Sequence, residues 1–302
     1  MKYNSLIQVQ EHFKDEKTCR EHLEELRWNG NVTCPFCHHD KVYKTNIGYK
    51  CANPKCYKKF TVLVGTFFEN TKIPLRKWFV AIYIATSHKK GISSLQLSRD
   101  IDVTQKTAWF MLHRIREMLN AKAPKMLSGI VEADETYIGG KNKNRHADKK
   151  IIDSQGRSLK DKTVVLGVFE RKGEIDSMPI KNTARETIQP LVKSLVKKGS
   201  KLITDEHSAY TELAGYYDHS IIKHAQKEYV RGSIHTNTIE GFWSLLKRGI
   251  IGIYHSVSEK HLEKYCNEFD FRYNTKDMNE EERFDKSISQ CNGRLKYNQL
   301  IA

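Results

Sequence analysis

Four cysteines in two short motifs constrain the fold of this 302-residue chain more than any other feature. A CxxC motif and a CxxxxC motif, separated by thirteen residues, contain Cys34, Cys37, Cys51 and Cys56. Two short loops that each supply two thiolates can complete a tetrahedral shell around Zn²⁺, and such a closed shell is structural. Between the motifs, Lys41–Lys50 predicts a hairpin, and Lys59–Val64 predicts a strand after the second motif. We therefore predict a zinc ribbon.

Two other interpretations of these residues stay open. The CxxC motif could be a redox pair beside two unrelated cysteines, although an odd total of seven cysteines argues against a disulfide framework. His38 and His39 could also replace a thiolate ligand, but with four cysteines available we expect both imidazoles at the surface. The second motif departs from the usual pattern, because zinc ribbons more often have CxxC where this chain has CxxxxC.

The charge of the chain indicates a polyanionic partner. Lys and Arg total 51 against 36 Asp and Glu, which gives a formal net charge of +15 and favours nucleic acid. Charge carried for solubility is the alternative. The longest apolar run, Trp78–Ala85, is far below the roughly 18 residues of a membrane helix, and the first residues lack a long apolar segment. We expect a cytoplasmic globular protein without a membrane partner.

A pair of helices is predicted after the ribbon, within Gly91–Leu119. Ser93 or Ser94 can cap a short helix, and Thr104 can cap a longer helix with one apolar face. Two helices joined by a tight turn resemble a helix-turn-helix, whose second helix enters the major groove. The expected DNA contacts are Gln105, Lys106 and Thr107 at bases and Arg99, Arg114 and Arg116 at phosphates. An ordinary helical hairpin is the alternative.

From Gly129 onward, strands and helices alternate in the order of an RNase H-like domain. Strands are predicted over Gly129–Ile138, Thr163–Phe169, Ile175–Ile180, Leu202–Asp205 and His219–His224, and helices over Ala184–Lys198, Asn237–Ile250 and Val257–Asn274. Pro190 is expected to shorten or bend the first of these helices. The basic segment Gly139–Lys162 is predicted to be an exposed loop that either grips DNA or is simply solvated.

Three acidic residues lie at defined places in this order of strands and helices. Asp134 lies in the first strand, Asp205 ends the fourth, and Glu240 lies in the first turn of the following helix. Clustered carboxylates suit Mg²⁺ or Mn²⁺. Two such ions about 4 Å apart can activate a water or a 3′-hydroxyl and stabilise the leaving oxygen at phosphorus. Lys247 follows Glu240 by nearly two helical turns, so we expect Lys247 and the adjacent Arg248 to contact DNA.

Several neighbours compete for these roles. Glu132, which strand alternation places on the same face as Asp134, is a rival metal ligand, as are Glu135 and Glu206. Asn237 rivals Glu240, because an amide oxygen can also bind a hard cation. His235 and His255 flank the helix, and either a phosphate contact or a structural role suits them.

As a set, the longer motifs resemble the zinc-ribbon DDE transposases of bacterial insertion sequences, the group with the ISXO-type transposase domain. The matching stretches include RWNGNVTCPFC, VEADETYIGGK, DEHSAY and HTNTIEGFWSLLKRGIIGIYHSVSEKHLEKYCNEFDFRYN. The resemblance implies that Asp134 and Asp205 are the first two catalytic acids. For the third position it implies Asn or Glu followed by Lys, and this chain offers both Asn237 and Glu240. We favour Glu240, since a carboxylate binds metal better.

The resemblance also implies an α+β multidomain protein. We expect a helical segment over residues 1–30, a zinc ribbon over 31–66, helix-turn-helix-like DNA-binding helices over 67–125, an RNase H-like catalytic domain over 126–280 and a tail over 281–302. The expected function is metal-dependent cleavage and joining of double-stranded DNA at the ends of an insertion sequence. A homodimer or larger assembly on bacterial nucleoid DNA is implied. A non-catalytic DNA-binding regulator and a metal-dependent nuclease are the alternatives.

Overall fold

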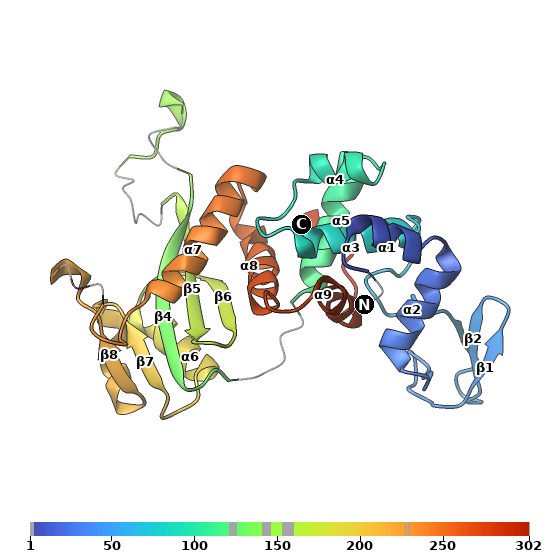
Figure 1. Cartoon of the computed structure of the whole chain (residues 1–302), viewed down its shortest axis with the longest axis horizontal. Helices are drawn as coiled ribbons and strands as arrows, with labels where there is room; N and C mark the ends of the chain where they lie inside the picture. The colour runs from blue at the N-terminus through green and yellow to red at the C-terminus, as the bar shows by residue number, and fades with distance from the viewer. Residues whose placement is uncertain are drawn as a thin grey trace. The chain divides into compact units, whose positions relative to one another are not determined.

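The structure is a computed structural model that describes residues 3–120, 126–140, 146–152, 160–226, 228 and 230–301. Its contacts divide the chain into two compact units (Figure 1). One unit combines Met1–Ala121 with Thr275–Ala302, and the other consists of Lys122–Asn274. The C-terminal residues thus belong with the N-terminal unit, although they follow the second unit in sequence.

Aromatic side chains form the centre of the first unit. Its helices α1 (Leu6–His12), α2 (Glu16–Trp28), α3 (Leu75–Ser87) and α9 (Glu280–Ser289) meet around buried rings. The Phe13 ring centroid lies 4.8 Å from that of Phe79, and Phe284 packs within 5.6 Å of both. Because Phe284 is on α9, the segment expected to be a tail contributes directly to this core.

The predicted hairpin is present in the ribbon. Strands β1 (Val42–Thr45), β2 (Gly48–Cys51) and β3 (Lys59–Phe60) form an antiparallel sheet in the order β1-β2-β3. The third strand is shorter than the predicted strand over Lys59–Val64. The chain turns directly after Phe60, where the Val64 N–H donates to the carbonyl of Thr61. Trp28 of α2 packs against the sheet through Tyr49 and Phe60.

Both helix starts predicted after the ribbon are confirmed. The Ser93 hydroxyl accepts from the Gln96 N–H at the start of α4 (Ser94–Asp100), and Thr104 does the same for α5 (Gln105–Met118). The connecting turn places Asp102 at a φ of 50°, a left-handed conformation that Asp tolerates better than most residues. The apolar face predicted for the second helix is buried.

The second unit is built on a five-stranded mixed sheet with the order β6-β5-β4-β7-β8. Its strands are β4 (Ile130–Gly139), β5 (Lys162–Glu170), β6 (Ile175–Ile180), β7 (Lys201–Thr204) and β8 (Asp218–Ile221). Strand β5 pairs antiparallel with both β4 and β6, and β7 and β8 run parallel to β4. This arrangement is the RNase H-like fold that the order of predicted elements indicated.

Helices cover both faces of the sheet (Figure 1). Alternation along β5 sends Val164, Leu166 and Val168 towards α6 (Arg185–Leu195) and a 3₁₀ segment over Ser208–Gly215. The intervening positions face α7 (Asn237–Gly249) and α8 (Glu259–Asn274). Pro190 lies inside α6 without ending it. None of the helices in the described residues is long and apolar enough to cross a membrane.

Candidate catalytic and metal sites

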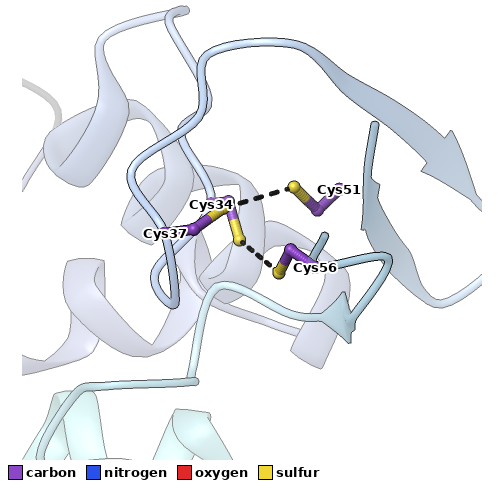
Figure 2. Close-up of side chains that lie close together, drawn as sticks. All are labelled: Cys34, Cys37, Cys51 and Cys56. Atoms are coloured by element: carbon purple, nitrogen blue, oxygen red, sulfur yellow. Dashed lines mark hydrogen bonds between the residues drawn. The ribbon is translucent and has the colours of Figure 1, made fainter. Parts of the chain in front are cut away.

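The four ribbon cysteines converge on one point (Figure 2). All four sulfur atoms lie within 4.8 Å of one another, with 3.8 Å between the sulfurs of Cys34 and Cys56 and 3.5 Å between those of Cys37 and Cys51. A tetrahedral Zn²⁺ with bonds of about 2.3 Å would place its sulfur ligands roughly 3.8 Å apart. The donor set and spacing therefore fit a closed structural zinc site, and neither His38 nor His39 belongs to this cluster.

Backbone groups in the two motifs support thiolates. A backbone hydrogen bond from His39 lowers the pKa of Cys37 to about 7. The backbone N–H of Asn53 points to the Cys51 sulfur at 3.4 Å and also acts to lower its pKa, although burial outweighs this and raises the pKa of Cys51 to about 12. His38 and Tyr57, each directly after the second cysteine of a motif, adopt left-handed φ values of 57° and 48°. These turns direct backbone donors at sulfur, and a thiolate is the form that binds metal.

Asp134 is a half-buried residue on β4, the central strand of the sheet in the second unit. It lies on the α7 side of β4, where the indole Nε1 of Trp243 donates to its Oδ2 over 2.9 Å. Gly167, its partner on β5, makes room for this indole: a Cβ there would lie 2.5 Å from a ring carbon of Trp243. Burial, followed by the charges of Glu135 and Asp205, raises the pKa of Asp134 to about 7.

Asp205 reaches the same region from the neighbouring parallel strand. The register pairs Glu132 of β4 with Ile203 of β7, so continuing it by two residues places Asp205 beside Asp134. The Asp205 carboxylate accepts the backbone N–H of His207 at 3.0 Å. The sheet thus brings together two aspartates that are 71 residues apart in sequence, as the sequence predicted for the first two acids.

Lys247 lies on the Asp134 side of α7. Burial lowers the pKa of this half-buried ammonium, while the negative charge of Asp134 acts in the opposite direction. Asn237, Glu240 and Ser244 continue the same polar stripe and are exposed, whereas the opposite side of α7 is packed in the core. A cationic group therefore accompanies the aspartate pair, with open polar positions along the helix.

Glu240 is engaged away from the two aspartates. Its Oε1 accepts the Thr236 hydroxyl at 3.0 Å and lies 3.8 Å from Nε2 of His224. Across the described ranges, the ribbon cysteines form the sole group of three or more metal-ligating side chains whose donor atoms lie within 4.8 Å of one another. Asp134, Asp205 and Glu240 therefore do not close around an ion in this conformation.

Glu132 lies on the same face of β4 as Asp134 but makes different contacts. Its fully buried carboxylate accepts the backbone N–H groups of Thr238 and Ile239 at 3.2 and 3.0 Å, in the first turn of α7. Negative charge is favourable at a helix N-terminus, where backbone donors lack partners. Glu132 therefore holds the start of α7 against β4.

Arg171 completes this arrangement, and no motif in the sequence singled it out. Its Nε donates to Glu132 Oε1 at 2.6 Å, and its two terminal nitrogens donate to the carbonyls of Ser233 and His235. The guanidinium thus ties the end of β5 to the chain entering α7. The signal in sequence was a glutamate at an inward strand position, because a buried carboxylate requires a cationic partner.

The other expected ligands and contacts are also placed. Glu135 accepts the Tyr210 hydroxyl at 2.7 Å, and Glu206 accepts the Ala225 backbone N–H at 2.9 Å. Nδ1 of His235 lies 3.6 Å from Oε1 of Glu132, which favours a structural role for this ring. His255 is exposed and adopts a left-handed φ of 61°. The predicted loop over Gly139–Lys162 falls partly outside the described residues, at 141–145 and 153–159.

The residues expected to contact DNA from the helix pair fall into two groups. Gln105 and Lys106 are exposed at the start of α5, and Thr107 is half-buried beside Thr104. Arg114 instead donates to the carbonyls of Phe67 and Leu295 at 2.9 and 3.1 Å, which occupies the guanidinium inside the first unit. Of the other expected phosphate contacts, Arg116 is buried, while Arg99 and Arg248 are exposed.

Comparisons with known proteins agree with this architecture. Residues 126–274 match the model of the ISXO2-like transposase domain, and residues 14–59 match the transposase zinc-ribbon domain. A protein of Halobacterium salinarum, described as an uncharacterized protein in transposable element ISH50, is 31% identical over 274 residues. That alignment covers 86% of this chain and 91% of the relative. The relative is archaeal, so it does not support the bacterial source expected above.

Two solved structures are also similar. A pre-cleavage Mos1 transpososome is 14% identical with a TM-score of 0.26, covering 68% of this chain and 75% of that chain. The Mos1 strand transfer complex is 15% identical with a TM-score of 0.28, covering 76% and 82%. Because these scores are low, the fold assignment rests on the strand order described above. The family assignment rests on the relative aligned along most of both chains and on the two matched domains, and by this evidence the chain belongs to the ISXO2-like transposases with an N-terminal zinc ribbon.

Proposed function

We propose that this chain cuts and joins DNA strands at the ends of an insertion sequence. The observation that carries the proposal is the position of the half-buried Asp134 beside Asp205 and Lys247, where the charge of Asp205 helps to raise the pKa of Asp134. Two neighbouring carboxylates repel each other and Asp134 also loses hydration, which is unfavourable without a cation beside it. Hard oxygen donors of this kind suit Mg²⁺ or Mn²⁺.

Glu240 is the proposed third metal ligand. It lies on the exposed stripe of α7 that ends at Lys247, and rotation of its side chain would release it from Thr236 and His224. Asn237, one turn earlier on the same stripe, is the rival. The contact between Glu132 and the first turn of α7 fixes the position from which either side chain would reach the aspartates.

The proposed reaction proceeds in two displacements at phosphorus. Bound Mg²⁺ would supply Lewis-acid stabilisation of the attacking and leaving oxygens. In the first displacement a water oxygen attacks the scissile phosphate, the bond to the 3′ oxygen breaks, and a 3′-hydroxyl is released. That hydroxyl then attacks a phosphodiester of target DNA, and the broken target strand keeps its own 3′-hydroxyl. The role of Lys247 is to hold a phosphate beside the aspartates.

The proposed partner is double-stranded DNA, both at the element ends and at the target. Gln105 and Lys106 are exposed at the start of α5, where a helix-turn-helix presents side chains to the major groove. Joining two ends in one event requires two active sites, so we expect a homodimer or larger assembly on DNA. Such an enzyme would act in the cytoplasm on nucleoid DNA.

A strand-transfer assay tests the proposal. The purified chain is incubated with duplexes of the element ends, a target plasmid and Mg²⁺, alongside the variants Asp134→Ala and Glu186→Ala. Glu186 is an exposed acid on α6, on the opposite face of the sheet from α7, and serves as the matched control. We expect joined products from the wild type and Glu186→Ala but none from Asp134→Ala. Binding without cleavage would indicate a regulator, and cleavage without joining would indicate a nuclease.

A second comparison separates the two candidates for the third ligand. Glu240→Gln keeps the size of the side chain but removes its charge, and Asn237→Ala removes the competing amide. If Glu240 binds the metal, Glu240→Gln abolishes joining and Asn237→Ala retains it. The opposite pattern would transfer the role to Asn237.

A further inference from the structure

Trp243 joins α7 directly to Asp134, one of the proposed metal ligands. Its side chain is buried in the core between the sheet and α7, and its indole Nε1 donates to Oδ2 of Asp134 over 2.9 Å. A buried tryptophan usually finds a partner for its N–H, and a backbone carbonyl or a neutral hydroxyl would satisfy it equally well. Here the partner is instead one of the two carboxylates that the proposed reaction needs.

The packing around the indole leaves it little freedom to move. Gly167 of β5 is the cross-strand partner of Asp134. A Cβ at Gly167 would lie 2.5 Å from Cη2 and 2.6 Å from Cζ2 of Trp243, so the ring lies directly on the backbone of β5. The ring of Phe242 packs beside it, with 5.3 Å between the two centroids. The glycine thus sets the position of the indole, and the N–H of the same ring reaches the neighbouring carboxylate.

The same hydrogen bond fixes the helix that carries the other proposed site residues. Glu240 precedes Trp243 by three residues and Lys247 follows it by four, so both are its neighbours on the surface of α7. Glu132 already holds the start of this helix by accepting two backbone N–H groups of its first turn. Two contacts at different points along α7 therefore fix both its position and its rotation against β4.

The chemistry of the indole suits a partner of a metal-binding carboxylate. Because the N–H engages Oδ2 of Asp134, the other oxygen, Oδ1, is left for a cation. The indole is neutral, so it orients the carboxylate without repelling a divalent cation, as an ammonium would. Burial raises the pKa of Asp134, and the hydrogen bond from Trp243 acts in the opposite direction, which favours the anion that binds metal. Hydrogen-bond partners of metal ligands typically contribute about 10–100-fold to metal affinity.

We propose that Trp243 is a positioning residue for the metal ligand Asp134, and that its N–H holds the carboxylate with Oδ1 directed at the cation. The indole itself contacts neither the metal nor DNA in this proposal. The alternative is that the N–H is merely satisfied by the nearest acceptor, and then its loss would leave metal affinity unchanged. The inference rests on the proposed function for the identity of the cation site, but it concerns metal binding alone.

The test measures Mn²⁺ binding by electron paramagnetic resonance, with the full chain bound to an end duplex. The site is defined as the part of the binding that Asp134→Ala abolishes. Trp243→Phe keeps an aromatic ring and removes the N–H, and we expect this site to bind Mn²⁺ about 10–100-fold more weakly. Trp78→Phe is the matched control, because Trp78 is also buried and its Nε1 donates over 2.9 Å to the hydroxyl of Thr71 in the first unit. The control should keep the wild-type affinity. Raised Mn²⁺ should restore joining in Trp243→Phe but not in Asp134→Ala.

A second replacement separates the hydrogen bond from the packing of the ring. Benzothienylalanine at position 243 has sulfur in place of the indole N–H and keeps the size and shape of the ring, so the core stays filled. We expect it to lose the same Mn²⁺ affinity as Trp243→Phe. Wild-type Mn²⁺ affinity in the benzothienylalanine protein would overturn the inference, whatever Trp243→Phe does. If Mn²⁺ binding requires both Asp134 and the N–H but the wild type never cuts or joins DNA, the proposed function fails and this inference stands.

Discussion

Asp134 carries a carboxylate at a position where a negative charge is costly. Burial and the neighbouring charges of Glu135 and Asp205 all favour its protonated form, while the indole of Trp243 partly compensates the anion. Shifts of this kind are concentrated at functional sites, because structure-forming positions rarely retain such repulsion. At the residue scale, the site is recognisable by the unfavourable negative charge of Asp134, which a bound cation would compensate.

Substitution of Asp134 by Asn should therefore stabilise the protein in the absence of metal. The pKa of Asp134 in the folded state is about 7, above its ordinary value of 3.8, so wild-type stability falls as pH rises from about 4 to 7 and is constant above. Asn does not titrate, and the gain from Asp134→Asn should be about 1–3 kcal/mol at pH 8 and shrink towards pH 4. Thermal unfolding at both pH values checks this, and a variant less stable than wild type at pH 8 would contradict it.

For the buried pair of Glu132 and Arg171 we predict that substitution lowers the stability of the protein, in contrast to Asp134→Asn. Glu132→Gln leaves the guanidinium of Arg171 without its charged partner and weakens the contact with the start of α7. Removal of one member of a buried ion pair costs about 3–5 kcal/mol. The control is Glu212→Gln, which breaks an exposed pair with Arg185 and should cost less than about 1 kcal/mol. Urea unfolding measures both, and equal costs would argue against a special role for Glu132.

At the scale of elements, the sequence predicts helix caps and apolar faces from local side-chain chemistry. It does not predict which distant segments contact each other. The caps at Ser93 and Thr104 and the apolar face of α7 follow from side-chain type and helical period, and all are present. The structure instead engages Arg114 with two backbone carbonyls that are distant in sequence. No periodic pattern encodes such a contact, and the same holds for the hydrogen bond from Trp243 to Asp134.

The ribbon offers a prediction at this scale. Its strands are only two to four residues long, so we expect the metal to supply much of their stability. Cys37→Ser should reduce bound zinc well below one per chain and lose the β1–β2 hairpin, as measured by metal analysis and amide exchange. Cys266→Ala changes a buried thiol in the core of the second unit and should keep its zinc. Full zinc content in Cys37→Ser would contradict the ribbon assignment.

For the whole molecule, the sequence predicts the RNase H-like order of elements but assigns residues 281–302 to a tail. The structure places α9 against α3 in the N-terminal unit, with a capping box at Asn279 and Glu282. The capping signal is local and visible in sequence, whereas the partner of the helix is more than 190 residues away. Long-range pairing of this kind is decided by complementary buried surfaces, which one sequence does not reveal.

The shared aromatic core predicts that the C-terminal residues stabilise the first unit. Phe284→Ala removes a fully buried ring from the contacts with Phe13 and Phe79, and we expect a loss of about 3–5 kcal/mol. Tyr216→Ala, at an exposed ring of the second unit, should cost much less. The two variants are compared by denaturant unfolding with fluorescence detection, and an unchanged midpoint for Phe284→Ala would contradict the packing of α9.

The central claim is that Asp134 and Asp205 bind divalent cations during strand joining. It is tested most directly by anomalous scattering from Mn²⁺ in crystals of the chain bound to an end duplex. We expect Mn²⁺ in contact with both aspartates and with either Glu240 or Asn237, close to the scissile phosphate. A complex that joins DNA in the crystal while no Mn²⁺ contacts Asp134 or Asp205 would contradict it.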